Sequence, residues 1–539
     1  MNSSSDICNK YFPYDKPREQ QVKIINKVIE NFKSGKKYAI VECGTGVGKS
    51  AIGFTIAKAI CNDSSLQSDK ENSSYFLTTQ KVLQEQYEKD FSKKGLKSLS
   101  SSSNYTCSRS NNKESCKDIH VLLKTKDVPK KLESCKFDCK YKIKKKDFIE
   151  SKLGITNFSY YLTEKNYSGK LPNKKVLIID EAHNLENELT RFIEISISEY
   201  FSEKILNIKI PKDINTQFKV YNWIKNFYLK GLISKINFME NKIEKLGLKS
   251  LISDFKKINN QYEMMKSHRD KIKRFINIYD KDNWVFDIDN SKKRKFIFKP
   301  IDISQYTHDY LLKYADFIVF MSATIISHDG FSTTIGLPIK DVVSIKEKSP
   351  FPAENNPILF TPAGSMSYNN IKNTLPITIN MIREIIKNHP EQKGIIHTHN
   401  IKISEEIKNN LKDKRLIVAY GKDRETALNK HIRSKKPTIL VSPSMAEGVD
   451  LKGSLSEFQI ICKIPFPYLG DKVTKKKMSK WDWWYDTQTV RTIIQSMGRS
   501  IRSEDDKAVT YILDKDWARL IKKNKNIFPA GFFDAYYEY

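Results

Sequence analysis

Three short stretches of the chain carry residue types that suit the handling of nucleoside triphosphates. The first is a glycine-rich loop, CGTGVGKS, at residues 43–50. Its glycines allow backbone N–H groups to surround phosphate oxygens, and the start of a following helix adds a favourable dipole. Lys49 would reach the β- and γ-phosphates, and the Ser50 hydroxyl would ligate Mg²⁺. We therefore expect ATP and Mg²⁺ to bind on Gly44, Thr45, Gly46, Val47, Gly48, Lys49 and Ser50.

Two adjacent acids, Asp180 and Glu181, follow an apolar run at residues 176–179. Successive side chains of a strand point in opposite directions, so one carboxylate can hold Mg²⁺ while the other acts on water. We assign Asp180 to the metal and Glu181 to positioning or deprotonating the attacking water. His183 is expected to couple this site to a second domain. The alternative is a solvated acidic pair at the end of a strand.

A third stretch, QSMGRSIR at residues 495–502, has the pattern of a basic helix. With 3.6 residues per turn, Gln495, Arg499 and Arg502 would share one face. Two guanidinium groups there could reach across a cleft and stabilise the charge that develops on a transferred phosphoryl group. We take all three residues as catalytic candidates, although such a face alone is usually only solvated.

Four cysteines lie in a lysine-rich stretch between the first two motifs: Cys107, Cys116, Cys135 and Cys139. The first ten residues lack the pattern of a secretory signal, so we expect an intracellular protein of the cytoplasm or nucleoid, of cellular or viral origin. In a reducing compartment, clustered cysteines indicate a metal site. The irregular spacing favours an iron–sulfur cluster over zinc, whose ligands come in close pairs, but spacing alone leaves zinc and free thiols open.

Strand-like apolar runs recur along the chain and are separated by helical segments. They lie at residues 38–42, 75–79, 176–180, 317–322, 394–398, 438–442, 460–464 and 508–513. Most are continuously hydrophobic, which is typical of strands buried on both faces of a parallel sheet. This number of strands indicates an α/β protein with two parallel-sheet domains.

Two regions depart from this pattern. Residues 98–146 are rich first in serine and then in lysine, and they contain the four cysteines. Residues 188–299 have a largely helical pattern, with an apolar stripe that we interpret as the packed core of a helical hairpin. The stripe consists of Leu251, Phe255, Ile258, Tyr262 and Met265. Both regions look like insertions into the first domain.

The formal net charge of +30 indicates a polyanionic partner, and nucleic acid is the obvious one. A lysine-rich composition, as an AT-rich genome would encode, accounts for part of the excess. A mean hydropathy of -0.54 and the lack of a long uncharged apolar run favour a soluble protein without a membrane span. The lysines at 140–146, near Phe137 and Tyr141, suit single-strand binding, with a solvated face as the alternative. The lysines at 475–477 and the tryptophans at 481–484 also suit single-strand binding. The alternative there is that the tryptophans pack in a core or an interface.

The ordered motifs resemble superfamily 2 helicases, and specifically the XPD/DinG family. In that superfamily the phosphate loop reads AxxGxGK[ST], so only Cys43, in place of alanine, is unusual. Further similar segments are YFPYDKPREQQ at 11–21, TTQKVLQEQ at 78–86, ITNF at 155–158, DEAHNL at 180–185, FKPID at 298–302, MSAT at 321–324, SPFP at 349–352, EGVD at 447–450 and IPFP at 464–467.

This resemblance implies two RecA-like motor domains. Domain 1 would comprise residues 1–97, 151–188 and 300–338, and domain 2 residues 339–539. An iron–sulfur domain at 98–150 and a helical Arch domain at 189–299 would be inserted in the first. The resemblance adds Gln20 or Gln21 as the base-reading residue, Asp450 as a nucleotide contact, and a [4Fe-4S] cluster on the four cysteines.

The resemblance further implies 5′ to 3′ movement on single-stranded DNA and unwinding of forked or tailed duplex, by a protein that we expect to be monomeric. The cysteine spacing looks nearer to the DinG arrangement than to that of XPD, and the Arch insertion is short. Other possible functions are a single-strand translocase or nucleoprotein remodeller with little unwinding, an RNA-acting helicase, and a non-catalytic nucleic-acid-binding protein. The intact lysine, acids and arginines argue against the last.

Overall fold

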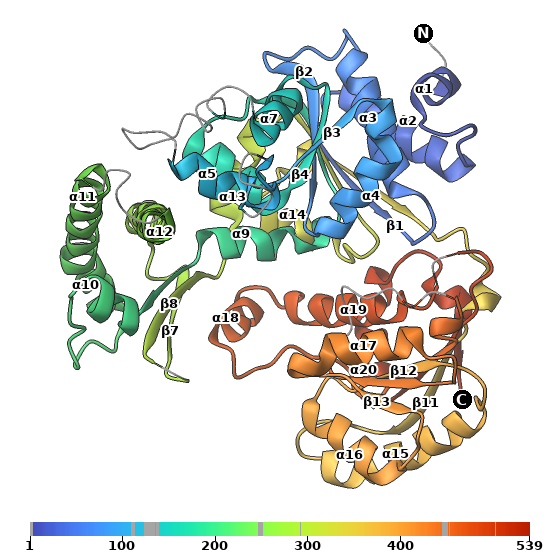
Figure 1. The fold of residues 1–539 in the computed structure, drawn as a ribbon. Coiled ribbons are helices and arrows are strands. Elements are labelled where there is room, and N and C mark those ends of the chain that lie inside the picture. The colour runs from blue at the N-terminus through green and yellow to red at the C-terminus, as the bar shows by residue number, and fades with distance from the viewer. Residues whose placement is uncertain are drawn as a thin grey trace.

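The structure is a computed structural model that describes residues 4–539 apart from 109–113, 123–134, 136–138, 246–251, 292, 445–450, 452 and 502. In this part the chain forms two large parallel sheets flanked by helices and one small antiparallel sheet (Figure 1). The predicted α/β class with two parallel-sheet domains is confirmed.

The first large sheet is built from the N-terminal part of the chain. Its strands are β1 (Tyr38–Cys43), β2 (Glu71–Thr78), β3 (Leu96–Leu99), β4 (Leu153–Asn157), β5 (Lys174–Ile179), β9 (Phe317–Ser322) and β10 (Val342–Glu347). Their order is β10-β1-β9-β5-β2-β4-β3, and all neighbours are parallel. The helices of this part are α1 (Ser4–Tyr11), α2 (Glu19–Lys33), α3 (Lys49–Asn62), α4 (Lys81–Phe91), α5 (Cys116–Leu122), α7 (Lys140–Glu150), α8 (Phe158–Thr163), α9 (Leu185–Ile193), α13 (Ser304–Tyr310) and α14 (His328–Ile335).

The apolar core continues on both faces of this sheet. Strand β5 is buried along its whole length, and its side chains alternate between two hydrophobic clusters. Leu177 and Ile179 belong to one cluster, whereas Val176 and Ile178 belong to the other, together with residues of α2 and α3. Because both faces are covered, the strand reads as a continuous apolar run.

The second large sheet is built from the C-terminal part of the chain. Its strands are β11 (Ile358–Gly364), β12 (Gly394–His397), β13 (Leu416–Val418), β14 (Ile439–Ser442), β15 (Phe458–Ile461), β16 (Val509–Asp514) and β17 (Tyr536–Glu538). They are parallel and follow the order β13-β14-β12-β15-β16-β11-β17. The helices here are α15 (Ile371–Lys387), α16 (Ile401–Leu411), α17 (Arg424–Arg433), α18 (Lys472–Lys480), α19 (Trp484–Met497) and α20 (Asp516–Asn524).

Two predicted boundaries of the first domain fall in the wrong place. Strand β10 pairs with β1, so the first sheet continues beyond residue 338 and ends at Glu347. Strand β3 extends to Leu99, past the predicted limit at residue 97. Strand β10 is a sheet edge in which buried and exposed residues alternate, so it lacks the continuous apolar run by which the inner strands were identified.

The insertion at residues 189–299 is not wholly helical. It contains α10 (Gln217–Trp223), α11 (Leu229–Lys245) and α12 (Ile252–Ile278), but also the antiparallel strands β6 (Ile195–Ser198), β7 (Trp284–Asp289) and β8 (Lys295–Pro300). In the predicted stripe, Tyr262 and Met265 are buried and Ile258 packs against the same core. Leu251 and the Phe255 side chain lie outside the described residues.

Helix α18 connects the second domain to this insertion, toward which it projects in Figure 1. Lys472 Nζ lies 2.9 Å from an Asp287 carboxylate oxygen, and the buried Lys477 ammonium pairs with Glu186. The side chains of Trp481 and Trp484 are buried. Lys477 and the two tryptophans therefore serve packing, one of the two interpretations, whereas Lys475 and Lys476 are exposed.

No helix in the described ranges is long and apolar enough to cross a membrane.

Candidate active site

The glycine-rich loop joins β1 to α3, as the sequence predicts. Gly46 and Gly48 have φ angles of 84° and 82°, in the left-handed region where a Cβ atom is unfavourable. The side chain of Cys43 is fully buried, and burial raises the pKa of its thiol to about 11. Cys43 therefore acts as a small core residue, which explains how it replaces alanine here.

The two acids at the end of β5 turn toward different partners. The Tyr87 hydroxyl donates to Asp180 Oδ2 at 3.0 Å, and the Glu181 N–H donates to Asp180 Oδ1 at 2.9 Å. Glu181 has a φ of 51°, and its Oε2 lies 3.2 Å from His183 Nδ1. The carboxylates are thus adjacent but differently held, as a metal ligand and a water-directing group would need to be.

Electrostatics also separate the two carboxyl groups. Burial and the adjacent Glu181 charge raise the pKa of Asp180 above its ordinary value. Burial acts in the same direction on Glu181, but His183, Lys49 and Arg499 outweigh it and hold the pKa of Glu181 below its ordinary value. Glu181 is therefore the more readily ionised of the pair.

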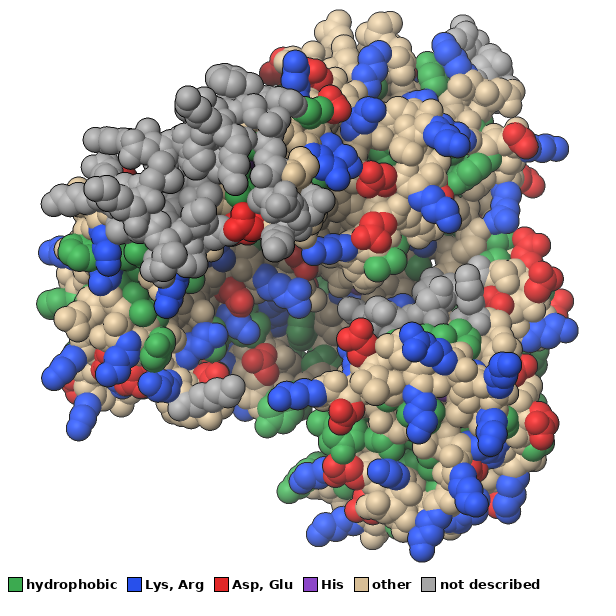
Figure 2. All heavy atoms as spheres, in the orientation of Figure 1, with side chains coloured by type: hydrophobic (Ala, Val, Ile, Leu, Met, Phe, Trp, Pro, Cys, Tyr) green, Lys and Arg blue, Asp and Glu red, His purple; other side chains and the backbone are tan. Residues whose placement is uncertain are grey.

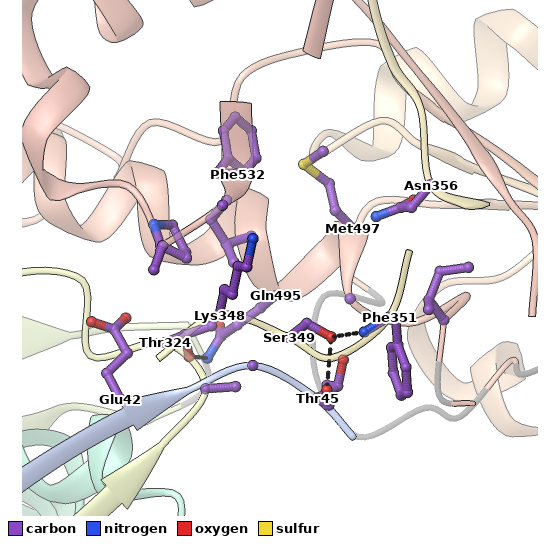
Figure 3. Close-up of a pocket in the computed structure, with 18 of the residues that line it drawn as sticks. Glu42, Thr45, Thr324, Lys348, Ser349, Phe351, Asn356, Gln495, Met497 and Phe532 are labelled. Atoms are coloured by element: carbon purple, nitrogen blue, oxygen red, sulfur yellow. Dashed lines mark hydrogen bonds between the residues drawn. The ribbon is translucent and has the colours of Figure 1, made fainter. Parts of the chain in front are cut away.

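A chain of side-chain contacts leads from these acids to the second domain. His183 Nδ1 lies 2.8 Å from Ser322 Oγ, and that hydroxyl accepts a bond from the Thr324 N–H at 3.1 Å. Gln495 Nε2, on α19, then donates to Thr324 Oγ1 at 3.2 Å, the contact drawn between these two residues in Figure 3. This arrangement agrees with the coupling role that we expect for His183.

Sequence reasoning missed Glu42, a buried carboxylate at the end of β1. It accepts a hydrogen bond from the Ile326 N–H at 2.9 Å, and it lies 3.0 Å from His328 Nε2 and 3.6 Å from Lys346 Nζ. Ile326 has a φ of 72°, which is unusual for a β-branched residue. Glu42 therefore fixes the strained turn after β9. In the sequence, the one feature that could have drawn attention to Glu42 is that it is an acid within an apolar run.

Arg491, also missed, reaches the same turn from the second domain. Its guanidinium donates to the carbonyl oxygen of Thr324 at 3.3 Å and to that of Ile325 at 3.2 Å. The residue stands four positions before Gln495 and so shares its face of α19. In the sequence, its spacing of four residues from Gln495 could have identified Arg491 as a candidate site residue.

A cavity of about 570 Å³ lies between the two large sheets. Figure 3 shows part of its lining. Gln20, Gly44, Thr45, Lys49 and Glu181 line it from the first domain. Gln495 and Arg499 line it from the second, so one volume is bounded by groups from all three sequence motifs.

The structure changes one detail of the predicted site and leaves two of its residues undescribed. Helix α19 ends at Met497 with Gly498 as its cap, so Arg499 is not on the helix; its Nε folds back to donate to the Gln495 carbonyl oxygen at 3.1 Å. A glycine at this point weakens the helix, which explains its early end. Arg502 and Asp450 lie outside the described residues.

The two candidate base-reading residues have different surroundings. The Gln21 side chain donates to the Val47 carbonyl oxygen at 2.8 Å and accepts from the Arg18 N–H at 2.9 Å, so both ends of its amide are used within the first domain. Gln20 lines the cavity instead. Of the two, Gln20 is placed to meet a ligand.

Family models match both large domains. A model described as "Type III restriction enzyme, res subunit" matches residues 15–208, and one described as "Helicase C-terminal domain" matches residues 382–532.

Solved structures match nearly the whole chain. A structure titled "XPD_Helicase" aligns with a TM-score of 0.61 at 16% identity, covering 98% of this chain and 100% of that one. "Structure of S. tokodaii Xpd4" aligns with a TM-score of 0.60 at 15% identity, covering 97% and 100%. The likeness shows the fold, two RecA-like domains with insertions in the first.

One sequence relative matches part of the chain. The "ATP-dependent DNA helicase DinG" of Photobacterium profundum is 29% identical over 183 residues, which cover 31% of this chain and 26% of that protein. The chain is thus similar to XPD structures in fold and to a DinG helicase over one segment of its sequence. The matched segment spans about a quarter of the DinG relative.

All four cysteines are buried, and the charges of the other three act on Cys116. A bridge between Thr106 and Ser115 holds Cys107 near Cys116, and Cys139 Sγ caps α7 by accepting the Lys142 N–H at 3.3 Å. Burial raises the pKa of the Cys116 thiol, and the other three cysteines raise it further. The donor set suits iron or zinc, although the described residues contain no three His, Cys, Asp or Glu side chains grouped around a metal position.

The lysine-rich helix α7 beside the cysteines is partly neutralised. Lys145 Nζ lies 2.7 Å from Glu164 Oε2, and Lys144 Nζ lies 3.8 Å from Glu88 Oε1. The Tyr141 ring is buried, so it does not present a stacking surface, and Phe137 lies outside the described residues. This weakens the interpretation of α7 as a base-stacking site.

Proposed function

We propose that this protein is an ATP- and Mg²⁺-dependent DNA helicase that moves 5′ to 3′ on single strands and opens forked or tailed duplex. The cavity between the two large sheets carries the proposal, because it gathers Lys49, Glu181 and Arg499 around one volume. No partner chain is needed to complete this lining, so we propose that the protein works as a monomer.

Each residue of the cavity has a role in phosphoryl transfer. The phosphate loop and Lys49 would hold the triphosphate, while Ser50 and Asp180 would ligate Mg²⁺. Glu181, the more acidic carboxyl group, would orient the attacking water. Arg499, from the other domain, would stabilise the developing charge, so hydrolysis would depend on the two domains being together.

Nucleic acid as the substrate is supported by the charge of the chain and by the DinG relative. Figure 2 shows Lys and Arg side chains spread over both large domains and within the hollow between the helical insertion and the second domain. The direction of movement rests on the family resemblance alone. A translocase with little unwinding and an RNA-acting helicase are the alternatives that the test must separate.

Replacing Lys49 by alanine should abolish activity. We expect single-stranded DNA to stimulate ATP hydrolysis by the wild type, and Lys49→Ala to lower that rate by at least about a hundredfold, as loss of a charge-stabilising donor does. Lys27→Ala, an exposed lysine on α2, is the matched control and should keep the wild-type rate.

The same preparations should be tested for strand displacement on duplexes with a 5′ or a 3′ tail, of DNA and of RNA. Preference for the 5′-tailed DNA supports the proposal. Hydrolysis without displacement indicates the translocase, and RNA-only activity indicates the RNA helicase. Appreciable DNA-stimulated hydrolysis by Lys49→Ala would refute the assignment of the site.

We further propose that the four cysteines hold a [4Fe-4S] cluster. In support, all four thiols are buried, three of them act electrostatically on Cys116, and Cys139 already accepts a backbone N–H bond, as cluster thiolates do. Nothing in ATP hydrolysis calls for electron transfer, so the cluster would act mechanically by tying the inserted segment to the first domain.

Anaerobically purified protein should be brown and contain about four iron atoms per chain. Cys135→Ser should lose iron, and it should lose strand displacement more completely than ATP binding. Cys61→Ser, which alters a cysteine outside this group, should keep both. A colourless protein that contains zinc would contradict the cluster.

A further inference from the structure

Three consecutive carbonyl groups of the phosphate loop accept hydrogen bonds from side chains outside the loop. The pairs are Ser349 Oγ to Thr45 O at 3.0 Å, Arg18 Nη1 to Gly46 O, and Gln21 Nε2 to Val47 O at 2.8 Å.

These bonds orient the groups that bind phosphate. In a trans peptide, the C=O of one residue and the N–H of the next point in opposite directions. Carbonyl oxygens drawn outward at residues 45–47 therefore turn the N–H groups of residues 46–48 the other way, toward the inside of the loop. Consecutive N–H groups with one direction form the concave anion site that a phosphate loop needs.

One of the three donors comes from a distant part of the chain. Ser349 lies on the connector between the two domains, residues 348–357, which follow β10 and precede β11. Its hydroxyl oxygen accepts the Phe351 N–H at 3.3 Å, which leaves the hydroxyl proton for the Thr45 carbonyl. Figure 3 shows both bonds, with Ser349 placed between Thr45 and Phe351.

The connector approaches the loop as closely as glycine allows. A Cβ atom on Gly44 would lie 2.8 Å from Ser349 Cβ, and one on Gly46 would lie 2.0 Å from Phe351 Cζ. A side chain at Gly44 would clash with the connector backbone, and one at Gly46 would clash with the Phe351 ring. The glycines therefore serve the contact with residues 349–351 as well as the turn itself.

A second donor is also linked to the C-terminal domain. Arg18 Nη2 lies 3.7 Å from Glu504 Oε1, a contact between exposed side chains. Two of the three donors are thus linked to the chain beyond the first sheet: Ser349 belongs to the connector, and Arg18 lies near Glu504. The Gln21 contact alone is wholly internal to the first domain.

We propose that Ser349 is a positioning residue for the nucleotide phosphates, because it holds the Thr45 carbonyl outward and so aims the Gly46 N–H at the ligand. This rests on the proposed function, which places a nucleoside triphosphate in the loop. The affinity for nucleotide then depends on the connector, and a domain movement that withdraws the connector would weaken phosphate binding.

The test compares Ser349→Ala with Ser344→Ala, an exposed serine on the preceding strand β10. The probe is a fluorescent ADP analogue with Mg²⁺, titrated into the full chain without DNA. Ser349→Ala should weaken its binding about two- to tenfold, the worth of one hydrogen bond. The KM for ATP should rise by the same factor, while kcat at saturating ATP stays within about twofold.

Thermal unfolding without nucleotide separates positioning from simple structural damage. Both serine variants should melt at the wild-type temperature, but nucleotide should raise that temperature less in Ser349→Ala than in Ser344→Ala. Unchanged affinity in Ser349→Ala, or a fall in kcat with unchanged KM, would overturn the proposal. A wild type that binds the analogue but hydrolyses no ATP would refute the proposed function and leave the Ser349 comparison intact.

Discussion

His397 is an imidazole in the interior of the second sheet, at the end of β12. Its side chain is fully buried, and neither ring nitrogen has a hydrogen-bond partner among the described residues. Burial, the neighbouring His399 and the positive charge of Arg499 lower the pKa of His397 to about 3. The ring is therefore neutral at physiological pH, and protonating it requires the surroundings to open.

This makes His397 a source of acid sensitivity. An unfolded histidine has a pKa near 6.5, so below that pH the unfolded chain binds a proton that folded His397 does not. Stability is then full above pH 6.5 and is lost as the pH falls, by about 1.5 kcal/mol between pH 6.5 and 5 for this one group. His397→Leu should remove that part of the loss.

The measurement is the midpoint of thermal unfolding at several pH values between 7.5 and 5. The midpoint of His397→Leu should fall less on acidification than that of the wild type. His308→Leu, which replaces an exposed histidine on α13, should follow the wild-type curve. Parallel curves for all three proteins would show that the pKa of His397 is the same in the folded and the unfolded chain.

Among the structural elements, most strands inside the two large sheets could be predicted from sequence, although the inner strands β4 and β11 were missed, and the edge strands could not. Seven of the eight predicted runs coincide with strands, since a strand inside a parallel sheet needs apolar residues on both faces, whereas the run at 460–464 overlaps only the end of β15, at residues 460 and 461. Strand β13, with only three residues, and β10, with alternating burial, present too few apolar residues to stand out. The antiparallel strands β6–β8 were hidden in the same way within a region of helical pattern.

In the active site, too, some residues could be predicted from sequence and others could not. The phosphate loop and the Asp180–Glu181 pair are local in sequence, so their residue types and spacing were enough to find them. Contacts between distant segments have no such pattern. Ser349 meets Thr45 across 304 positions, and only folding brings them together. Helix α19 shows a third case, because one glycine ended the helix before Arg499.

At the scale of the whole molecule, the net charge of +30 has two possible origins. It can serve nucleic-acid binding, or it can reflect a lysine-rich composition with no binding role. Figure 2 shows Lys and Arg side chains in the hollow between the helical insertion and the second domain, as well as on outward surfaces. Ion pairs such as those on α7 neutralise part of the total.

Salt dependence distinguishes the two origins, because each phosphate that a protein neutralises releases bound counterions. The logarithm of the association constant for an oligo-dT strand should fall linearly with the logarithm of NaCl concentration. If the charge serves binding, the slope should be steeper than about −3, which corresponds to roughly four phosphates or more. A neutral-backbone morpholino of the same sequence should show no measurable binding. A slope shallower than about −1, or equal binding of the morpholino, would mean that the excess lysines are spread over surfaces that the strand does not touch.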